Sequence, residues 1–251
     1  MLLVWGEICR EPEYSMSARS TLQQFGWVTR LFHWLTALLI LTAFPLGLYA
    51  NDLPFDTSEA LAWKAQVFSL HKTLGVMAFL VAVARILWAL GSPHPVPLHP
   101  ERRAELFLAN LVHWLLYLSM LAVPLTGWIH HAAVTGFAPI LWPFGQDLPF
   151  VPKSEGLAAS AAGLHWLFTK LLGVAILLHI LGALKHHLID RDATLRRMTR
   201  GEIAPRSIVV PQGSVLPAVA AGAIYALAAG GPPFGPAPKK GPAPATPPPP
   251  P

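Results

Sequence analysis

The chain has 251 residues, of which 53% are hydrophobic and only 12% are charged, and its formal net charge is +5. Soluble domains carry about 25% charged residues, so this chain has too few charges to cover a water-facing surface and is predicted to be an integral membrane protein. Its basic residues form no stripe with polar neighbours, which excludes a nucleic-acid-binding protein. Cys9 is the only cysteine, so neither an intrachain disulfide nor an iron–sulfur cluster held by cysteines alone can form.

Residues 1–23 are expected to be an N-terminal cytoplasmic segment. The start is a poor signal peptide, because its short apolar run precedes the first positive charge and no long apolar region follows. The first membrane span is therefore expected to insert the chain itself. Met16 is an alternative start, with residues 1–15 a mis-assigned extension.

Residues 24–200 are expected to form one transmembrane domain. Four stretches within it are apolar over the roughly 20 residues that a spanning helix needs. Tryptophans stand near most of their ends, as in the aromatic belts of membrane proteins, and turn-rich linkers join them. The sequence thus predicts an all-α fold, an integral membrane four-helix bundle. The expected spans are Leu31–Ala50, Val67–Leu90, Leu106–Ala133 and Leu157–Leu184.

Residues 201–251 are expected to be an Ala- and Pro-rich tail that is mostly disordered. More than half of the residues from Pro232 onward are proline, a composition typical of disordered or polyproline-like segments. The apolar stretch Val215–Ala229 is only 15 residues long. That length is short for a span, and a marginal fifth helix is the alternative for this stretch.

Basic residues predict the orientation of the spans. They are more numerous beside the first span's start, between the second and third spans, and after the fourth span. By the positive-inside bias, both termini are expected to be cytoplasmic. The basic residues on this side are Arg10, Arg19, Arg30, Arg85, Arg102, Arg103, Lys185, Arg191, Arg196, Arg197, Arg200 and Arg206, against Lys64, Lys72, Lys153 and Lys170 on the other.

Histidines on the proposed spans are the strongest functional feature, because ionisable residues are costly inside a bilayer and usually functional there. His165 and His179 are 14 residues apart, so they lie roughly 40° apart around one helix and about 21 Å apart along it. One helix face therefore presents an imidazole toward each membrane surface. By their distance from the span ends, His33 lies at the depth of His179, and His71 at the depth of His165.

This arrangement predicts two haems stacked across the membrane, because neutral imidazole is a common axial ligand of haem iron. Two occupied axial positions favour electron transfer over O₂ activation, which needs an open position. The chain has no C-x-x-C-H motif for covalent attachment. The alternative for a single intramembrane histidine is an interhelical hydrogen bond without iron. For His113 the favoured interpretation is such a hydrogen bond or a polar group on the quinone side, in both cases without iron.

Short motifs in a fixed order surround these histidines. They are R-L-F-H-W in the first span, L-H-K-T-L-G in the second, A-V-P-L-T-G-W at the end of the third, and G-L-H-W followed by L-L-H-I-L-G in the fourth. With them the chain resembles the bacterial cytochrome b561 family over about Gln24–Met198. The resemblance implies that His33, His71, His165 and His179 bind two non-covalent b haems. It also implies electron exchange with quinone in the bacterial inner membrane.

Three cations near the histidines are candidates for pairing with haem propionates through charge-assisted hydrogen bonds. They are Arg30, which precedes His33 by one turn, Lys72, which follows His71, and Lys170. The alternative for each is snorkelling to the interface without a partner.

The sequence predicts an electron-transfer cytochrome that connects membrane quinone with a second redox partner, and no residue is assigned a catalytic role. One alternative is a membrane-anchor cytochrome b subunit of a periplasmic dehydrogenase or hydrogenase, with residues 131–160 as the docking surface. A more remote alternative is a histidine-based metal-ion transporter, which the lack of acidic residues inside the spans disfavours. A homodimer is left open as the assembly.

Overall fold

The computed structural model describes residues 17–134, 136–203 and 214–231, and within these ranges the chain forms helices and no strand. The predicted start at Met1 or Met16, the single Cys9 and the proline-rich end lie outside the described residues. The four predicted spans are present, which confirms the all-α membrane fold. The helices are α1 (Trp27–Asp52), α2 (Ser58–Leu90), α3 (Arg103–Ala132), α4 (Glu155–Lys185) with a π-helical turn (His186–Asp190), α5 (Thr194–Thr199) and α6 (Leu216–Gly230).

All four long helices begin before their expected apolar spans, α2 by the most, and a side chain caps the first turn of α2 and of α4. The Thr57 side chain accepts a hydrogen bond from the backbone N–H of Ala60. The Ser154 side chain accepts a hydrogen bond from the backbone N–H of Leu157. Such caps satisfy backbone donors that have no partner within the helix. A search for apolar runs alone misses these turns.

The long helices present their apolar side chains outward. All four are long and apolar enough to cross a membrane. Leu38 on α1 is 65% exposed and Leu87 on α2 is 63% exposed. Exposing many large aliphatic side chains to water would be unfavourable, whereas hydrocarbon accommodates them. The described helices therefore have the surface of a membrane protein.

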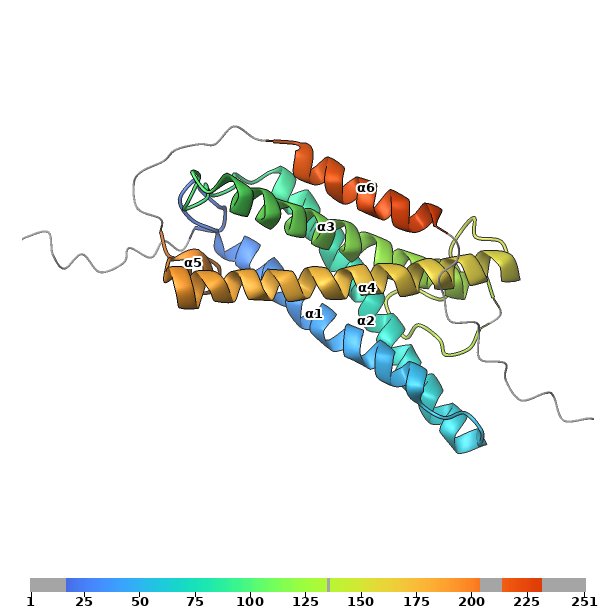
Figure 1. Ribbon diagram of the computed structural model, residues 1–251. Coiled ribbons are helices and arrows are strands. Elements are labelled where there is room, and N and C mark those ends of the chain that lie inside the picture. The colour runs from blue at the N-terminus through green and yellow to red at the C-terminus, as the bar shows by residue number, and fades with distance from the viewer. Residues whose placement is uncertain (1–16, 135, 204–213, 232–251) are drawn as a thin grey trace, which may run out of the picture.

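The four spans are arranged as two pairs. Helix α1 packs along α2, and α3 packs along α4, while neither α1 nor α2 packs closely against α4. Figure 1 shows the first pair crossing the second at an angle, with α6 beside α3. Pro45 lies inside α1 and Pro124 inside α3, where a proline removes one backbone hydrogen bond and favours a bend. Helix α2 also packs against α3, which joins the two pairs.

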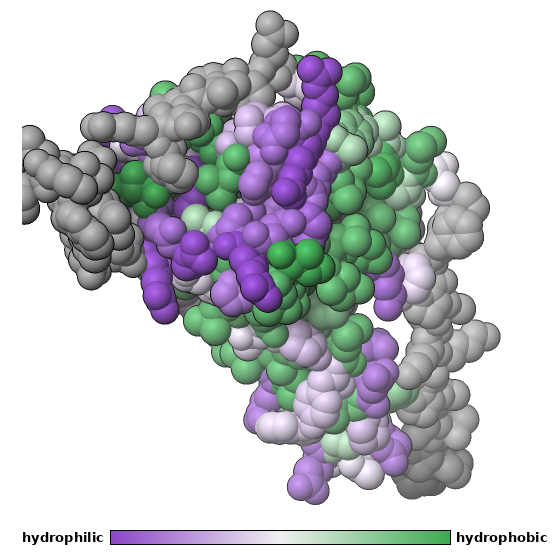
Figure 2. All heavy atoms as spheres, turned by 60° about the vertical axis from the view of Figure 1, so that its left-hand side comes forward, coloured by the Kyte–Doolittle hydropathy of each residue, from purple (hydrophilic) through white to green (hydrophobic). Residues whose placement is uncertain are grey.

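Loops and α5 form a cap over one end of the bundle, and we call it the α5 end. The guanidinium of Arg197 donates to the carbonyl oxygens of Val96 and Gln23. These hydrogen bonds join α5 to the loop between α2 and α3 and to the segment before α1. The Trp34 indole donates to the carbonyl of Met198, which fixes α5 to α1. Figure 2 shows hydrophilic side chains gathered at this end above apolar flanks. This is the end that the positive-inside bias assigns to the cytoplasm.

The tail differs from its prediction over one segment. Within residues 201–251, for which the sequence predicts mostly disorder, Leu216–Gly230 forms the regular helix α6, which is the alternative given above for this stretch. Its face with Pro217, Ala221 and Tyr225 is buried, and it packs mainly on α3 and to a lesser extent on α4. Packing against α3 and α4 supplies the stability that such a short helix lacks alone.

Asp192 holds several parts of the α5 end together. Its carboxylate accepts hydrogen bonds from the backbone N–H of Thr194 and from the His186 ring, and it lies 3.1 Å from Nε2 of His99. Burial alone would raise the pKa of Asp192, but the hydrogen bonds from Thr194 and His186 outweigh it and lower the pKa to about 2. Because the folded-state pKa is lowered, the charged carboxylate stabilises the fold above the pKa of the unfolded chain, and this stabilisation is lost as the pH falls toward 2.

We therefore expect Asp192→Asn to lower stability by about 1 kcal/mol at pH 7, since it removes charge-assisted hydrogen bonds. The difference from the unchanged protein should shrink as the pH falls below about 4. Thermal unfolding in detergent across this pH range measures both effects. Asp147→Asn is the control, because Asp147 pairs with Lys153 on an exposed loop. Equal destabilisation by the two variants would contradict the assignment.

Candidate functional site

The structure brings the four predicted histidines together in two pairs. The ring centroids of His33 on α1 and His179 on α4 are 6.0 Å apart. Those of His71 on α2 and His165 on α4 are 6.3 Å apart. All four side chains are half-buried, and they extend between helices whose backbones do not pack closely. The predicted pairing by depth is therefore the pairing that the fold produces.

His71 lies in a cradle formed by one turn of α1. Its Nδ1 is 2.9 Å from the carbonyl oxygen of Ala43, to which it donates when Nδ1 carries the proton. A Cβ added to Gly47 would lie 2.6 Å from Cε1 of His71, so a glycine is needed where the ring approaches the helix. This hydrogen bond leaves Nε2 free to bind a metal.

His165 lies in a matching cradle on α3. Its Nδ1 is 2.8 Å from the carbonyl oxygen of Val123, and a Cβ added to Gly127 would lie 3.0 Å from its ring. Metal-binding histidines commonly donate their other ring N–H to a carbonyl, which fixes the tautomer and the ring orientation. His71 and His165 lie away from the α5 end, and we call them the outer pair. Both are held in the way that is common for metal-binding histidines.

The separation of the rings also fits an iron between them. With metal–nitrogen bonds of about 2 Å and each ring centroid roughly 1 Å beyond its nitrogen, two axial imidazoles have centroids about 6 Å apart. Both pairs match this separation. The four rings are half-buried, and they lie where the backbone of α4 does not pack closely against α1 and α2. The residues present therefore fit a haem at each pair.

The inner pair, His33 and His179, has two further neighbours that the sequence-based prediction did not assign to it. The ring centroid of His113 is 5.2 Å from that of His179, a shorter separation than an intervening iron requires. His113 places Nδ1 2.7 Å from the carbonyl oxygen of Ala109 in its own helix, so this hydrogen bond is intrahelical. Its position makes it a neighbour of the inner pair.

Arg85 on α2 is the second neighbour of the inner pair. In the sequence it served only as a marker of orientation. Its guanidinium acts electrostatically on His33, His113 and His179 and lies 5.3 Å from the Tyr117 ring centroid. A spacing signal could have identified it. Arg85 follows His71 by 14 residues, the same spacing as His179 after His165, so α2 presents a histidine and an arginine on one face.

The three cations proposed for propionates have different surroundings. Lys72 is buried, and its ammonium donates to the carbonyl oxygens of Phe137 and Ala138. Lys170 is exposed, with its ammonium 5.4 Å from the Trp166 ring centroid. Neither contact involves a histidine pair.

Arg30 is placed differently from the two lysines. Its Nη1 donates to the carbonyl of Thr199, whereas its Nε is buried and has no hydrogen-bond partner within the described part of the chain. A buried donor of this kind needs an acceptor, and a propionate oxygen would supply one.

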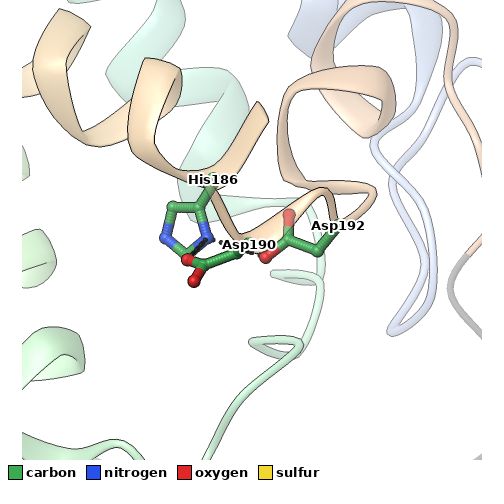
Figure 3. A group of neighbouring side chains, drawn as sticks. All are labelled: His186, Asp190 and Asp192. Carbon is green, nitrogen blue, oxygen red and sulfur yellow. Dashed lines mark hydrogen bonds and ion pairs between the residues drawn. The ribbon is translucent and has the colours of Figure 1, made fainter. Parts of the chain in front are cut away.

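A second cluster of metal-binding side chains lies at the α5 end. Figure 3 shows His186, Asp190 and Asp192 turned toward one another, and one ligand atom from each lies within 4.8 Å of the others. Asp190 already pairs with Lys185 and with Arg102 at 3.2 Å. These cations neutralise the carboxylate that a metal ion would need, so the cluster is an ion-pair network that closes the bundle end.

Comparison with known proteins shows which sequences this chain is similar to. The model of the family described as prokaryotic cytochrome b561 matches residues 24–201. The chain is 32% identical to cytochrome b561 homolog 2 of Escherichia coli over 184 residues, which cover 73% of this chain and 95% of that protein. It is 28% identical to the probable superoxide oxidase CybB of Yersinia pestis over 66% of this chain and 90% of that protein. It is 25% identical to cytochrome b561 homolog 1 of Escherichia coli over 70% of this chain and 97% of that protein.

The glycine cradles give a direct test of the outer pair. We expect Gly47→Ala to displace the His71 ring, because overpacking of this kind costs about 1–3 kcal/mol. The haem content of the purified protein should fall, and Gly127→Ala should have a similar but weaker effect. Gly75→Ala on α2 and Gly182→Ala on α4 are matched controls, because an added Cβ meets nothing within 4 Å at either site. Equal haem content in all four variants would refute the role of the cradles.

Proposed function

Because the chain belongs to the prokaryotic cytochrome b561 family, we propose that it transfers electrons across the bacterial inner membrane through two bis-histidine b haems and exchanges them with membrane quinone. The family match itself shows a membrane cytochrome b that transfers electrons and binds b-type haem. The number of haems, their ligands and the quinone are our proposal. The observation that supports them most is the pair of ring separations of 6.0 and 6.3 Å at two depths.

In this proposal the chain's own residues hold and tune the cofactors. His33 with His179, and His71 with His165, would each hold one haem through their ring nitrogens. When bound, each haem supplies a one-electron iron couple. The carbonyls of Ala43 and Val123 would fix the outer rings through Nδ1. With both axial positions filled, the site favours electron transfer over O₂ binding.

Charges distinguish the two ends of the proposed pathway. The guanidinium of Arg85 lies near the inner pair, where it would favour the reduced iron and the ionised propionates. Arg30 is a further candidate there because of its unpaired Nε. The basic residues of the α5 end support our proposal that this end, with the N-terminal segment, faces the cytoplasm.

A second candidate concerns the electron donor at the outer end. One relative is named a probable superoxide oxidase, and superoxide is an anion that releases one electron to become O₂. Beside the outer pair, the ammonium of Lys72 acts electrostatically on His71 and His131. A cation next to the outer pair would attract an anionic donor, so superoxide is the donor that this observation favours.

The proposed ligands are tested by removing one histidine at a time. We expect the purified protein to contain about two b haems per chain by the pyridine haemochrome assay. His33→Ala and His179→Ala should each reduce this to about one, because a bis-histidine site that loses a ligand binds haem weakly. The outer haem should keep its band in the reduced-minus-oxidised spectrum.

His113→Ala is the control for these variants, and it should retain both haems. If His113→Ala lost the inner haem while His33→Ala kept it, the partner of His179 would be His113. Two haems in both His33→Ala and His179→Ala would overturn the proposed pairing. Reduction of the protein by a quinol, compared with reduction by generated superoxide, separates the two candidate partners.

Arg85 should tune the inner haem through its charge. A positive charge nearby disfavours the ferric form, so Arg85→Gln is expected to lower the midpoint potential of the inner haem by roughly 40 mV, equivalent to about 1 kcal/mol. Redox titration followed in the visible spectrum measures this shift. Arg103→Gln is the matched control, since Arg103 is exposed at the start of α3. An unchanged inner potential, or an equal shift in both haems, would contradict this role.

A further inference from the structure

Helix α6 (Leu216–Gly230) lies outside the part of the chain that the family comparison matches. It contains no charged residue. Its inner face consists of Pro217, Ala221 and Tyr225 at intervals of four residues, and all three are buried. Helix α6 therefore has one face fixed to the protein and an opposite face turned away from it.

The inner face of α6 is attached at the middle of the bundle. The Tyr225 hydroxyl donates to Oγ of Ser119, which in turn donates to the carbonyl of Leu115. The Tyr225 ring lies 4.8 Å from that of Phe168, centroid to centroid. Ser119 is near the centre of α3, and Phe168 is near the centre of α4. Tyr225 therefore lies at the depth of the bilayer centre.

The length of α6 places its two ends. Nine residues separate Leu216 from Tyr225, a rise of roughly 14 Å, which is about half of a hydrocarbon core of roughly 30 Å. Figure 1 shows α6 starting toward the α5 end and running beside α3 toward the opposite end. Leu216 then lies at the hydrocarbon boundary on the α5 side. Gly230 lies roughly 8 Å beyond Tyr225, inside the other half of the core.

The outer face of α6 is apolar, and no other part of the described chain covers it. Leu227 is 78% exposed, Leu216 is 64% exposed and Val219 is 62% exposed. At the depth of the four spans, acyl chains are the surroundings that satisfy such side chains. We propose that α6 is a fifth membrane-crossing segment, with lipid acyl chains covering its face of Leu216, Val219 and Leu227, so that the chain beyond Gly231 continues to the side opposite α5.

The sequence around α6 is compatible with this crossing. More basic residues precede α6 than follow it. Those before it are Arg191, Arg196, Arg197, Arg200 and Arg206, and those after it are Lys239 and Lys240. This difference follows the positive-inside bias for an α5 end in the cytoplasm. After Gly231 the sequence continues with Pro232 and Pro233. Proline has no backbone N–H, so these residues bring no donor that would need a partner in hydrocarbon. The C-terminus would then be on the outer side, and not on the cytoplasmic side as the sequence analysis expected.

The test uses the full chain with Cys9→Ser and one new cysteine at a time. In intact spheroplasts, a membrane-impermeant maleimide should label Ala237→Cys, beyond α6. It should label Ala18→Cys, at the other end of the chain, only after permeabilisation. Leu227→Cys should react in neither condition and only after denaturation, because acyl chains exclude the reagent.

Each other result overturns the proposal. Labelling of Ala18→Cys and Ala237→Cys from the same side would show that α6 does not cross. Labelling of Leu227→Cys in the folded protein would show that water reaches its outer face. Protection of Leu227→Cys together with copper-catalysed formation of disulfide-linked dimers would assign that face to a second copy of the chain. None of these results depends on haem or quinone.

Discussion

The need to hold two imidazoles apart at two depths of a membrane determines the rest of this structure. A ring separation of about 6 Å leaves room for a metal ion but none for close backbone packing between the helices that carry the rings. Helix α4 carries His165 and His179, and it stays away from α1 and α2 while packing tightly along α3. Burial of apolar surface within the two helix pairs, and between α2 and α3, stabilises the bundle, while the histidine rings lie where α4 does not pack closely on α1 or α2.

A 14-residue spacing repeats on all four spans and explains how each helix serves both depths. Because 14 residues are almost a whole number of turns, each spacing puts two positions on nearly one face. The spacing is found in His33 and Gly47, His71 and Arg85, His113 and Gly127, and His165 and His179. Helices α1 and α3 thus each carry a histidine at the inner depth and a ring-accommodating glycine at the outer depth. The first helix pair and the second are built on the same plan, which makes Arg85 the counterpart of His179.

The two ends of the bundle are stabilised by different interactions. At the α5 end, Arg197 and Asp192 connect segments that are far apart in the sequence through hydrogen bonds and ion pairs. At the other end, the Lys72 ammonium holds the loop carbonyls of Phe137 and Ala138. Lys72 and Arg197 are both buried, and the carbonyl oxygens that accept from them supply the partners that a buried cation needs. These contacts fix the helix ends.

The sequence by itself determined the four spans, their apolar surface and the depth of each histidine, because hydrophobic length and helical periodicity are local properties of the chain. It also identified the family, through motifs that the comparison confirmed. It did not determine the surroundings of Arg85 or the glycine cradles of His71 and His165, since both depend on which helix faces are in contact. Nor did it determine the helical conformation of Leu216–Gly230. A 15-residue stretch of this composition has too little intrinsic stability to be assigned alone, and only its packing against Ser119 and Phe168 in the tertiary structure decided it.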